Sequence, residues 1–172
     1  MARMIARRTW RFFETFVGDA DNWLPPDNFQ EDPQAKIAHR TSPTDIGLLL
    51  LSTISAHDFG YIGTLELTER LGFTFATLEK LEKYRGHYLN WYDTQTLAPL
   101  APRYISTVDS GNFAGHLLAV KQAVIEIPDR KLFDTRVMEG LTDSLEMMRE
   151  ESTDCPFEVC QGLAAVERRG WL

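Results

Sequence analysis

Apolar residues recur every three or four positions along almost the whole chain, and this helical spacing constrains the fold more than any other feature. Together with the proline and glycine breaks, it predicts helices at about 2–17, 43–57, 64–86, 106–127, 129–151 and 156–169. No stretch gives a convincing strand pattern, and the segment 87–104, with its DTQT turn and two prolines, favours at most one small hairpin. The sequence therefore predicts an all-α chain of about six helices, arranged as three successive antiparallel pairs.

Two of these helices are expected to begin at the same kind of cap. The runs Ser42-Pro43-Thr44-Asp45 and Ser106-Thr107-Val108-Asp109 each place an acidic residue three positions after a serine. This is the capping-box pattern, in which the serine and the acidic side chain satisfy each other's backbone amides. A structural role for Asp109 is therefore expected, although a carboxylate fixed at a helix N-terminus can also bind hydroxyl groups.

Composition excludes several classes of function. The 172 residues suffice for one globular domain, and 25 acidic against 18 basic residues give a net charge of -7, which argues against a nucleic acid partner. The longest apolar run, 46–56, is too short to span a membrane. Two cysteines at a spacing that fits neither a zinc site nor a redox pair favour a reduced, cytoplasmic protein.

The lengths of the connections indicate where a binding site could lie. If successive helices run antiparallel, the two long connections, 18–41 and 87–104, share one end of the bundle. The short connections at 60–63 and 128 share the other end. Long loops on a rigid helical scaffold are a common place for function.

Both long connections combine aromatic rings with carboxylates, amides and an arginine. Sugars stack their C–H faces on aromatic rings and need directional partners for their hydroxyls, so a sugar-binding cleft is one interpretation. The alternative is structural: Trp23 and Trp91 cap the core, Asp93 starts a turn and Arg40 pairs with an acidic loop residue. The candidate binding residues are Trp23, Asp27, Asn28, Arg40, Asn90, Trp91, Tyr92, Asp93 and Asp109.

Other chemistries lack support in the sequence. The four histidines fall at wide, irregular intervals that form no zinc-binding pair, so structural roles are expected for them and no metal site is predicted. A phosphate-binding loop, a dinucleotide-binding glycine motif and a serine-hydrolase elbow are all missing, and no cofactor is predicted.

Several long strings identify a family resemblance. They resemble a segment of bacterial cyclic β-1,2-glucan synthase, closely over about 7–122 and loosely beyond. The strings, in chain order, are RRTWRFFETFV, WLPPDNFQEDP, HRTSPTDIGLLLLS, AHDFGYIGTLE and RGHYLNWYDTQTLAPLAPRYISTVDSGNFAGHL.

The resemblance implies a fold and a reaction. In that family a membrane-anchored polypeptide joins a glycosyltransferase, a central (α/α)6-toroid domain that cyclises the glucan by retaining transglycosylation, and a phosphorylase-like domain. This chain is similar to the first half of the toroid, so residues 1–172 are expected to form one incomplete helical-toroid domain. The two family glutamates lie in motifs similar to ASEAR and GISES, neither of which occurs here. The resemblance therefore implies no catalytic residue in this chain.

Three functions remain open. The first is a fragment of such a synthase that contributes glucan-binding loops, through NWYDT, STVDSG and HRTSPT, and is inactive alone. The second is a free-standing helical carbohydrate-binding or scaffold protein. The third is a small glycoside hydrolase that uses Asp27, Asp93 or Asp109 as its carboxylate pair. A half toroid is also expected to leave apolar helix faces uncovered, which favours self-association or assembly with the rest of the synthase.

Overall fold

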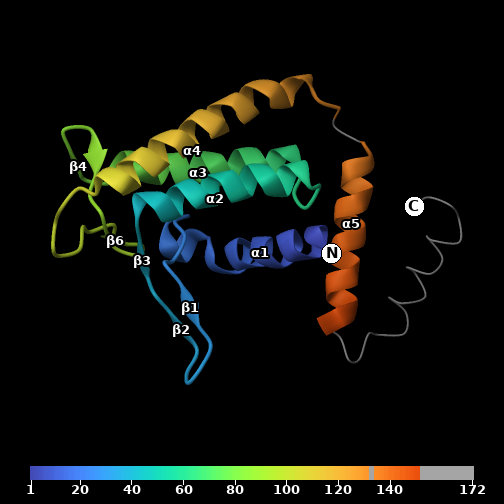
Figure 1. Cartoon of the computed structure of the whole chain (residues 1–172), viewed down its shortest axis with the longest axis horizontal. Helices are drawn as coiled ribbons and strands as arrows, with labels where there is room; N and C mark the ends of the chain where they lie inside the picture. Colours follow the sequence, from blue (N-terminus) through green and yellow to red (C-terminus); the bar gives the residue numbers. More distant parts are fainter. Residues whose placement is uncertain (132–133, 152–172) are drawn as a thin grey trace, which may run out of the picture.

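The computed structural model describes residues 1–131 and 134–151, and the fold is helical as predicted (Figure 1). The predicted helix at 156–169 lies outside the described residues. The α-helices in the described part are α1 (Ala2–Phe16), α2 (Pro43–Asp58), α3 (Thr64–Lys80), α4 (Thr107–Glu126) and α5 (Thr135–Glu151). Two single 3-10 turns, Asp19–Asp21 and Ile127–Asp129, follow α1 and α4.

Helices α2 and α4 are the most closely packed helix pair among the described residues. They run in the same direction and pack closely, while α1 and α3 run the opposite way (Figure 1). Gly47 of α2 makes this approach possible, because a Cβ there would lie 2.1 Å from Nδ1 of His116 on α4. The core around them is made of Trp10, Leu24, Ile46, Leu50, Ile54, Leu67, Leu71, Leu78, Tyr92, Phe113 and Val120.

Helix starts follow the predicted caps only in part. Ser42 and Asp45 form a complete capping box at α2. At α4 the Ser106 hydroxyl accepts from the Asp109 amide at 3.1 Å, as expected. The Asp109 carboxylate, however, bonds to other elements of the structure, described below.

The long connections contain more strand pairing than the predicted single hairpin. Three two-stranded antiparallel ladders are present in the described chain. The pairs are β1 (Phe29–Gln30) with β2 (Lys36–Ile37), β3 (Arg40–Thr41) with β6 (Tyr92–Asp93), and β4 (Lys83–Tyr84) with β5 (His87–Tyr88). Such short ladders satisfy loop backbone groups but give no periodic signal in the sequence.

The third helix ends earlier than predicted. Its last residue is Lys80, and Arg85 and Gly86 then form a two-residue hairpin loop between β4 and β5. Both residues have positive φ angles, 52° and 85°, as the tight hairpin turn requires. Leu81 is already extended, so the β4–β5 hairpin takes the place of the last predicted turns of the helix.

The apolar residues of helix α5 at helical spacing are only partly covered. The helix crosses the ends of the other helices at the short-connection side (Figure 1) and contacts α1. Leu141 and Met148 are 52% and 56% exposed and Val137 and Leu145 are half-buried, whereas Gly140, Asp143 and Met147 are buried. The contact is polar, since Arg3 Nε donates to Asp143 Oδ2 at 2.7 Å and Arg7 Nε donates to Ser144 Oγ at 3.0 Å.

Within the described ranges, no helix combines the length and apolarity that crossing a bilayer demands. The same residues contain no group of three or more acidic, histidine or cysteine side chains that could hold a metal ion.

Candidate functional site

The two long connections meet at one end of the molecule, as predicted from the antiparallel order of the helices and the lengths of their connections. Strand β3 of the first connection pairs with β6 of the second. The Asn22 amide donates to the carbonyls of Thr94 and Gln95, both at 2.9 Å, and His39 Nδ1 lies 2.7 Å from Asp21 Oδ1. The helix N-termini of α2 and α4 point to this end (Figure 1). Six of the nine candidate residues lie there in one continuous polar network.

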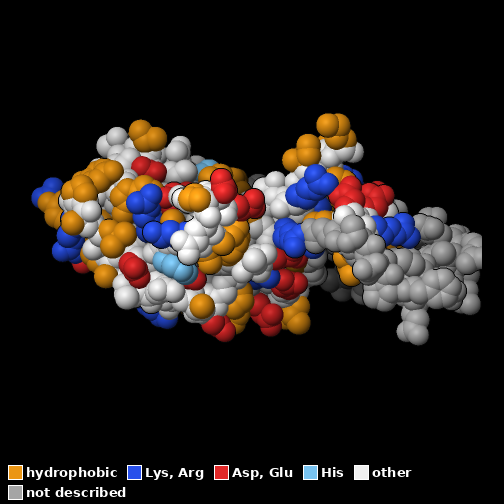
Figure 2. All heavy atoms as spheres, turned by 90° about the horizontal axis from the view of Figure 1, so that it is seen from below, with side chains coloured by type: hydrophobic (Ala, Val, Ile, Leu, Met, Phe, Trp, Pro, Cys, Tyr) orange, Lys and Arg blue, Asp and Glu red, His pale blue; other side chains and the backbone are white. Residues whose placement is uncertain are grey.

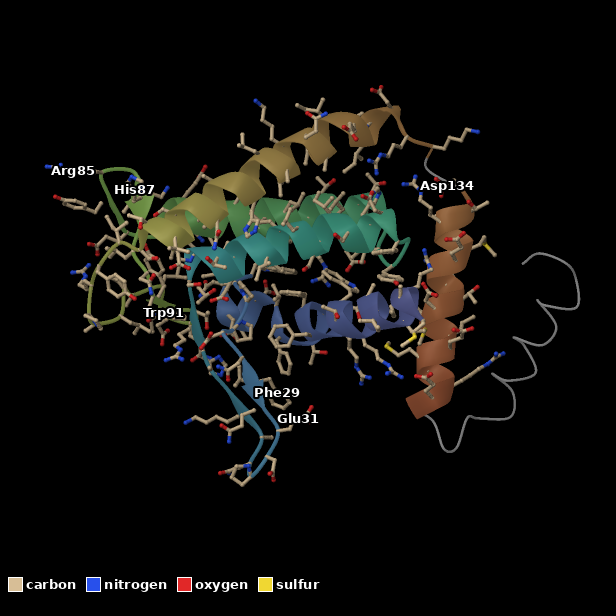
Figure 3. The ribbon with its side chains drawn as sticks, in the orientation of Figure 1. Phe29, Glu31, Arg85, His87, Trp91 and Asp134 are labelled. Carbon is tan, nitrogen blue, oxygen red and sulfur yellow. The ribbon has the colours of Figure 1, made fainter. Side chains whose placement is uncertain are left out.

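The first half of the network is built around Arg40. Its Nε and Nη2 donate to Asp27 Oδ2 at 3.0 and 2.7 Å, and the Asn28 amide donates to the same oxygen at 3.0 Å. The Arg40 guanidinium also lies over the ring of Trp91, 4.9 Å from its centroid. Arg40 therefore holds the first connection against Trp91 of the second. Figure 3 shows Trp91 at the end of the molecule where the long connections lie.

The second half is organised by the buried Asn90 amide. With this amide oriented to satisfy its neighbours, its oxygen accepts from Trp91 Nε1 at 2.7 Å and from the Tyr104 hydroxyl at 2.8 Å. Its nitrogen donates to Asp109 Oδ2 at 3.0 Å. Asn90 thus fixes the indole of Trp91 and joins it to the start of α4.

Asp109 connects the N-termini of α2 and α4. Its Oδ1 accepts from the Thr44 hydroxyl of α2 at 2.6 Å, and Asn112 of α4 donates to the same hydroxyl at 3.4 Å. The carboxylate does not reciprocate the Ser106 cap, so the expected local role is replaced by a contact between helices. The N-terminal helix dipole favours a negative charge at this position.

Asp45 is a third carboxylate beside this network. Burial raises its pKa above the ordinary value of 3.8, against the lowering effect of hydrogen bonds from Ser42. The negative charges of Asp27 and Asp109 raise it further. The end of the molecule therefore carries a group of carboxylates that are held by hydrogen bonds and an arginine.

The other three candidate residues lie outside the network. Trp23 stacks on Phe73 of α3, with ring centroids 4.7 Å apart, and its Nε1 donates to Asp19 at 2.7 Å. Tyr92 is completely buried in the core. The Asp93 carboxylate accepts from the Thr96 amide at 2.7 Å, and these turn hydrogen bonds hold the pKa of Asp93 below its ordinary value. Asp93 therefore starts a turn, as the structural alternative for this residue predicted.

Three residues of the network were not among the candidates: Thr44, Tyr104 and Asn112. Thr44 belongs to a capping motif, and its contact with Asp109 of another helix gives no local signal in the sequence. Tyr104 and Asn112 flank the second cap, and their mixture of ring and amide is the same signal that singled out Asn90 and Trp91.

A large cavity lies away from this chemistry. It has a volume of about 630 Å³ and opens between α3 and α4 at the short-connection end, with mainly apolar walls formed by Leu67, Leu71, Phe75, Val124 and Ile127. It lacks the carboxylates and amides of the network, so it suits an apolar occupant better than a sugar.

Figure 2 shows mixed basic, acidic and apolar side chains on the face seen from below, rather than a uniformly basic surface.

The network is suited to binding hydroxyl-rich molecules more than to acid–base catalysis. Asp27 is engaged by Arg40, Asp93 by its own turn, and Asp109 by Thr44 and Asn90. A glycosidase needs one carboxyl as acid and another as nucleophile or base across the scissile bond. The arrangement instead offers an indole, an exposed tyrosine ring and fixed hydrogen-bonding groups, which is what sugar recognition requires.

Sequence comparison connects this chain to a glucan synthase. The chain is 50% identical over 155 residues, or 90% of its length, to the cyclic β-(1,2)-glucan synthase NdvB of Rhizobium meliloti (strain 1021). The resemblance to cyclic β-1,2-glucan synthases is confirmed. The matched segment is 6% of NdvB, so the chain spans only a small part of that protein. No protein-family model matches the chain.

Structural comparison supports the partial toroid. A candidate glucoamylase from Bacteroides caccae superposes with a TM-score of 0.63 at 20% identity, over 83% of this chain and 34% of its own. A second, from Bacteroides fragilis, gives 0.61 at 18% identity, over 82% and 33%. At these identities the match concerns the fold, and it agrees with part of a glucoamylase-like (α/α)6 toroid.

Proposed function

We propose that this chain contributes glucan-contacting loops to the toroid domain of a cyclic β-1,2-glucan synthase and does not cyclise glucan on its own. The observation that carries the proposal is the network from Asp27 through Arg40, Trp91 and Asn90 to Asp109, at the end where both long connections meet. The similarity to NdvB supplies the substrate class, a β-1,2-linked glucan.

The geometry of the network explains how it would hold a glucan. One face of Trp91 is covered by the Arg40 guanidinium, and its Nε1 is held by Asn90, so the indole is fixed before a ligand arrives. A fixed ring loses little conformational entropy on binding. Tyr104, 46% exposed, donates to the same Asn90 oxygen as Trp91, and Asn112 lies beside Thr44 further along the network; both carry groups that can bond to sugar hydroxyls.

Calorimetry with linear β-1,2-gluco-oligosaccharides tests the proposal, with two tryptophan variants as a matched pair. Trp91→Ala is expected to weaken binding about three- to tenfold, because a stacked aromatic contact contributes about 0.5–1.5 kcal/mol. Trp23→Ala removes an equivalent ring that stacks on Phe73, and is expected to leave the affinity unchanged. Equal losses in both variants, or no binding by the folded wild-type chain, would reject the proposed role.

A further inference from the structure

A small pocket lies between the β4–β5 hairpin and the start of α4, with a volume of about 270 Å³. Its walls include Pro43, the first residue of α2, together with His87 and Tyr88 of the hairpin and Ser110 and Phe113 of α4. None of the pocket residues belongs to the hydrogen-bonded network described above. Figure 3 shows His87 and Trp91 at the same end of the molecule, so the pocket and the network are distinct features of one end.

The pocket and the network are joined at the first turns of α2 and α4. Pro43 lines the pocket, and the next residue, Thr44, belongs to the network. Ser110 lines the pocket, and the preceding residue, Asp109, belongs to the network. The Thr44 hydroxyl donates to Asp109 Oδ1 at 2.6 Å. This hydrogen bond therefore holds together two helix starts that each contribute to both sites, and a ligand in one site lies beside the other.

The walls of the pocket are held in place by contacts within the chain. The Tyr88 hydroxyl donates to the Leu78 carbonyl of α3 at 3.1 Å, and the Tyr88 ring packs edge-on against Phe113, with ring centroids 5.4 Å apart. These contacts fix the hairpin against both α3 and α4. Ala114 and Leu117 complete the α4 wall, because residues three or four apart lie on one face of a helix. A pocket formed in advance loses little conformational entropy when it is filled.

The pocket combines apolar walls with two unused polar groups. Pro43, Phe113 and Leu117 supply the apolar walls. Among the described residues, the Ser110 hydroxyl and the His87 imidazole make no side-chain hydrogen bond. Each of these two groups can both donate and accept a hydrogen bond when the imidazole is neutral. A purely apolar occupant would use neither group, whereas a sugar offers a C–H face to the walls and hydroxyls to both.

We propose that this pocket binds a second glucosyl unit of the β-1,2-linked glucan, further along the chain from the unit held at Trp91. His87 and Ser110 form hydrogen bonds with its hydroxyls, and its C–H face packs on the apolar wall of α4. The inference rests on the proposed function, because the network holds the first unit and the similarity to NdvB gives the class of substrate. The affinity should therefore depend on glucan length, since a glucan too short to reach both sites gains nothing from the pocket.

Calorimetry with the β-1,2-linked disaccharide and with longer linear oligosaccharides tests the inference. Ala114→Phe fills the pocket with a ring, and should remove the gain in affinity with length while leaving the affinity for the disaccharide unchanged. Ala119→Phe is the matched control, because Ala119 is exposed on the same helix and does not line the pocket. His87→Ala alters an exposed side chain, so it tests the pocket even if Ala114→Phe fails to fold. It should weaken binding of the longer oligosaccharides about two- to tenfold, the range for one lost hydrogen bond, whereas Arg85→Ala at the hairpin tip should not.

The variants separate this inference from the proposed function. Unchanged affinity for the longer oligosaccharides in folded His87→Ala and Ala114→Phe would overturn the pocket, and a loss in Trp91→Ala would then still support the proposed function. Equal losses in Ala114→Phe and Ala119→Phe would also overturn the pocket. A loss in the pocket variants without a loss in Trp91→Ala would support the pocket as a glucan site and reject the proposed role of the network. Absence of binding by the folded wild-type chain would reject both.

Discussion

Tyr92 was a candidate sugar-binding residue, yet the structure makes it a core residue whose replacement should affect folding alone. Its side chain is completely buried in the described structure. The hydroxyl accepts from the Leu89 amide at 2.7 Å and donates to the Glu82 carbonyl at 2.6 Å. Tyr92→Phe keeps the ring and removes both hydrogen bonds.

The cost of this substitution follows from the groups left unpaired. A buried amide without a partner costs about 1–3 kcal/mol, and the lost bond to the carbonyl adds about 1 kcal/mol. We therefore expect a loss of about 2–4 kcal/mol in the free energy of unfolding. For a chain of this size, that lowers the unfolding midpoint by roughly 4–16 °C.

Alkaline titration provides an independent check. Burial raises the pKa of Tyr92 to about 12, from an ordinary value of 10.0. The unfolded chain therefore loses this proton first, and stability should fall as the pH rises from about 10 to about 12. Tyr92→Phe should reduce that fall without abolishing it, because burial also raises the pKa of Tyr61 to about 12.

The assay is thermal unfolding followed by circular dichroism, combined with calorimetry of glucan binding. Tyr104→Phe is the matched control: its hydroxyl bonds to Asn90 within the network, while its ring is 46% exposed. Tyr92→Phe should destabilise the fold and leave the affinity unchanged. Tyr104→Phe should leave the unfolding midpoint unchanged and weaken the affinity for the glucan. An unchanged unfolding midpoint, or a weaker affinity in folded Tyr92→Phe, would refute the reasoning.

Three further outcomes are expected. Asp45 has a raised pKa and Asp93 a lowered one, so as the pH falls toward and below 4, protonation of Asp45 should stabilise the fold and protonation of Asp93 should destabilise it. Measured by thermal unfolding across that pH range, Asp45→Asn should lack the stabilising contribution and Asp93→Asn the destabilising one. If both variants had the same pH profile of stability as the wild-type chain, the assignment would be contradicted. Asp143→Ala leaves Arg3 without its 2.7 Å partner and should speed hydrogen exchange in α5 before the other helices; uniform exchange would contradict it. Incubation with linear β-1,2-glucan should yield no cyclic product by mass spectrometry, and a cyclic product would reject the proposed inactivity.

Local signals predicted much of the fold. Proline and serine at 42–43 marked the start of α2, and the apolar spacing marked α1, α2 and α4 to within a residue or two. The predicted end of α3 was wrong because residues 83–88 pair as a hairpin, although the apolar spacing up to Leu81 remains helical. The packing of α5 was not predicted, because it contacts α1 through ion pairs and places Gly140 against the backbone of residues 59–60, and apolar spacing gives no signal for either contact.

The site was predictable to the extent that it depends on connection length. The alternating direction of successive helices predicted that the two long connections share one end, and strands β3 and β6 pair there. Individual contacts depend on tertiary structure: the Asp109 carboxylate has a suitable amide nearby at Ser106, yet bonds to Thr44 and Asn90 instead. Spacing cannot distinguish those outcomes, since both begin from the same capping motif.

Nuclear magnetic resonance of the labelled chain, titrated with linear β-1,2-glucan, tests the central claim most directly. The account predicts that the indole N–H signal of Trp91 and the side-chain amide signals of Asn90 shift on binding, while the Trp23 indole signal stays in place. Shifts confined to Trp23, or to the cavity between α3 and α4, would contradict it.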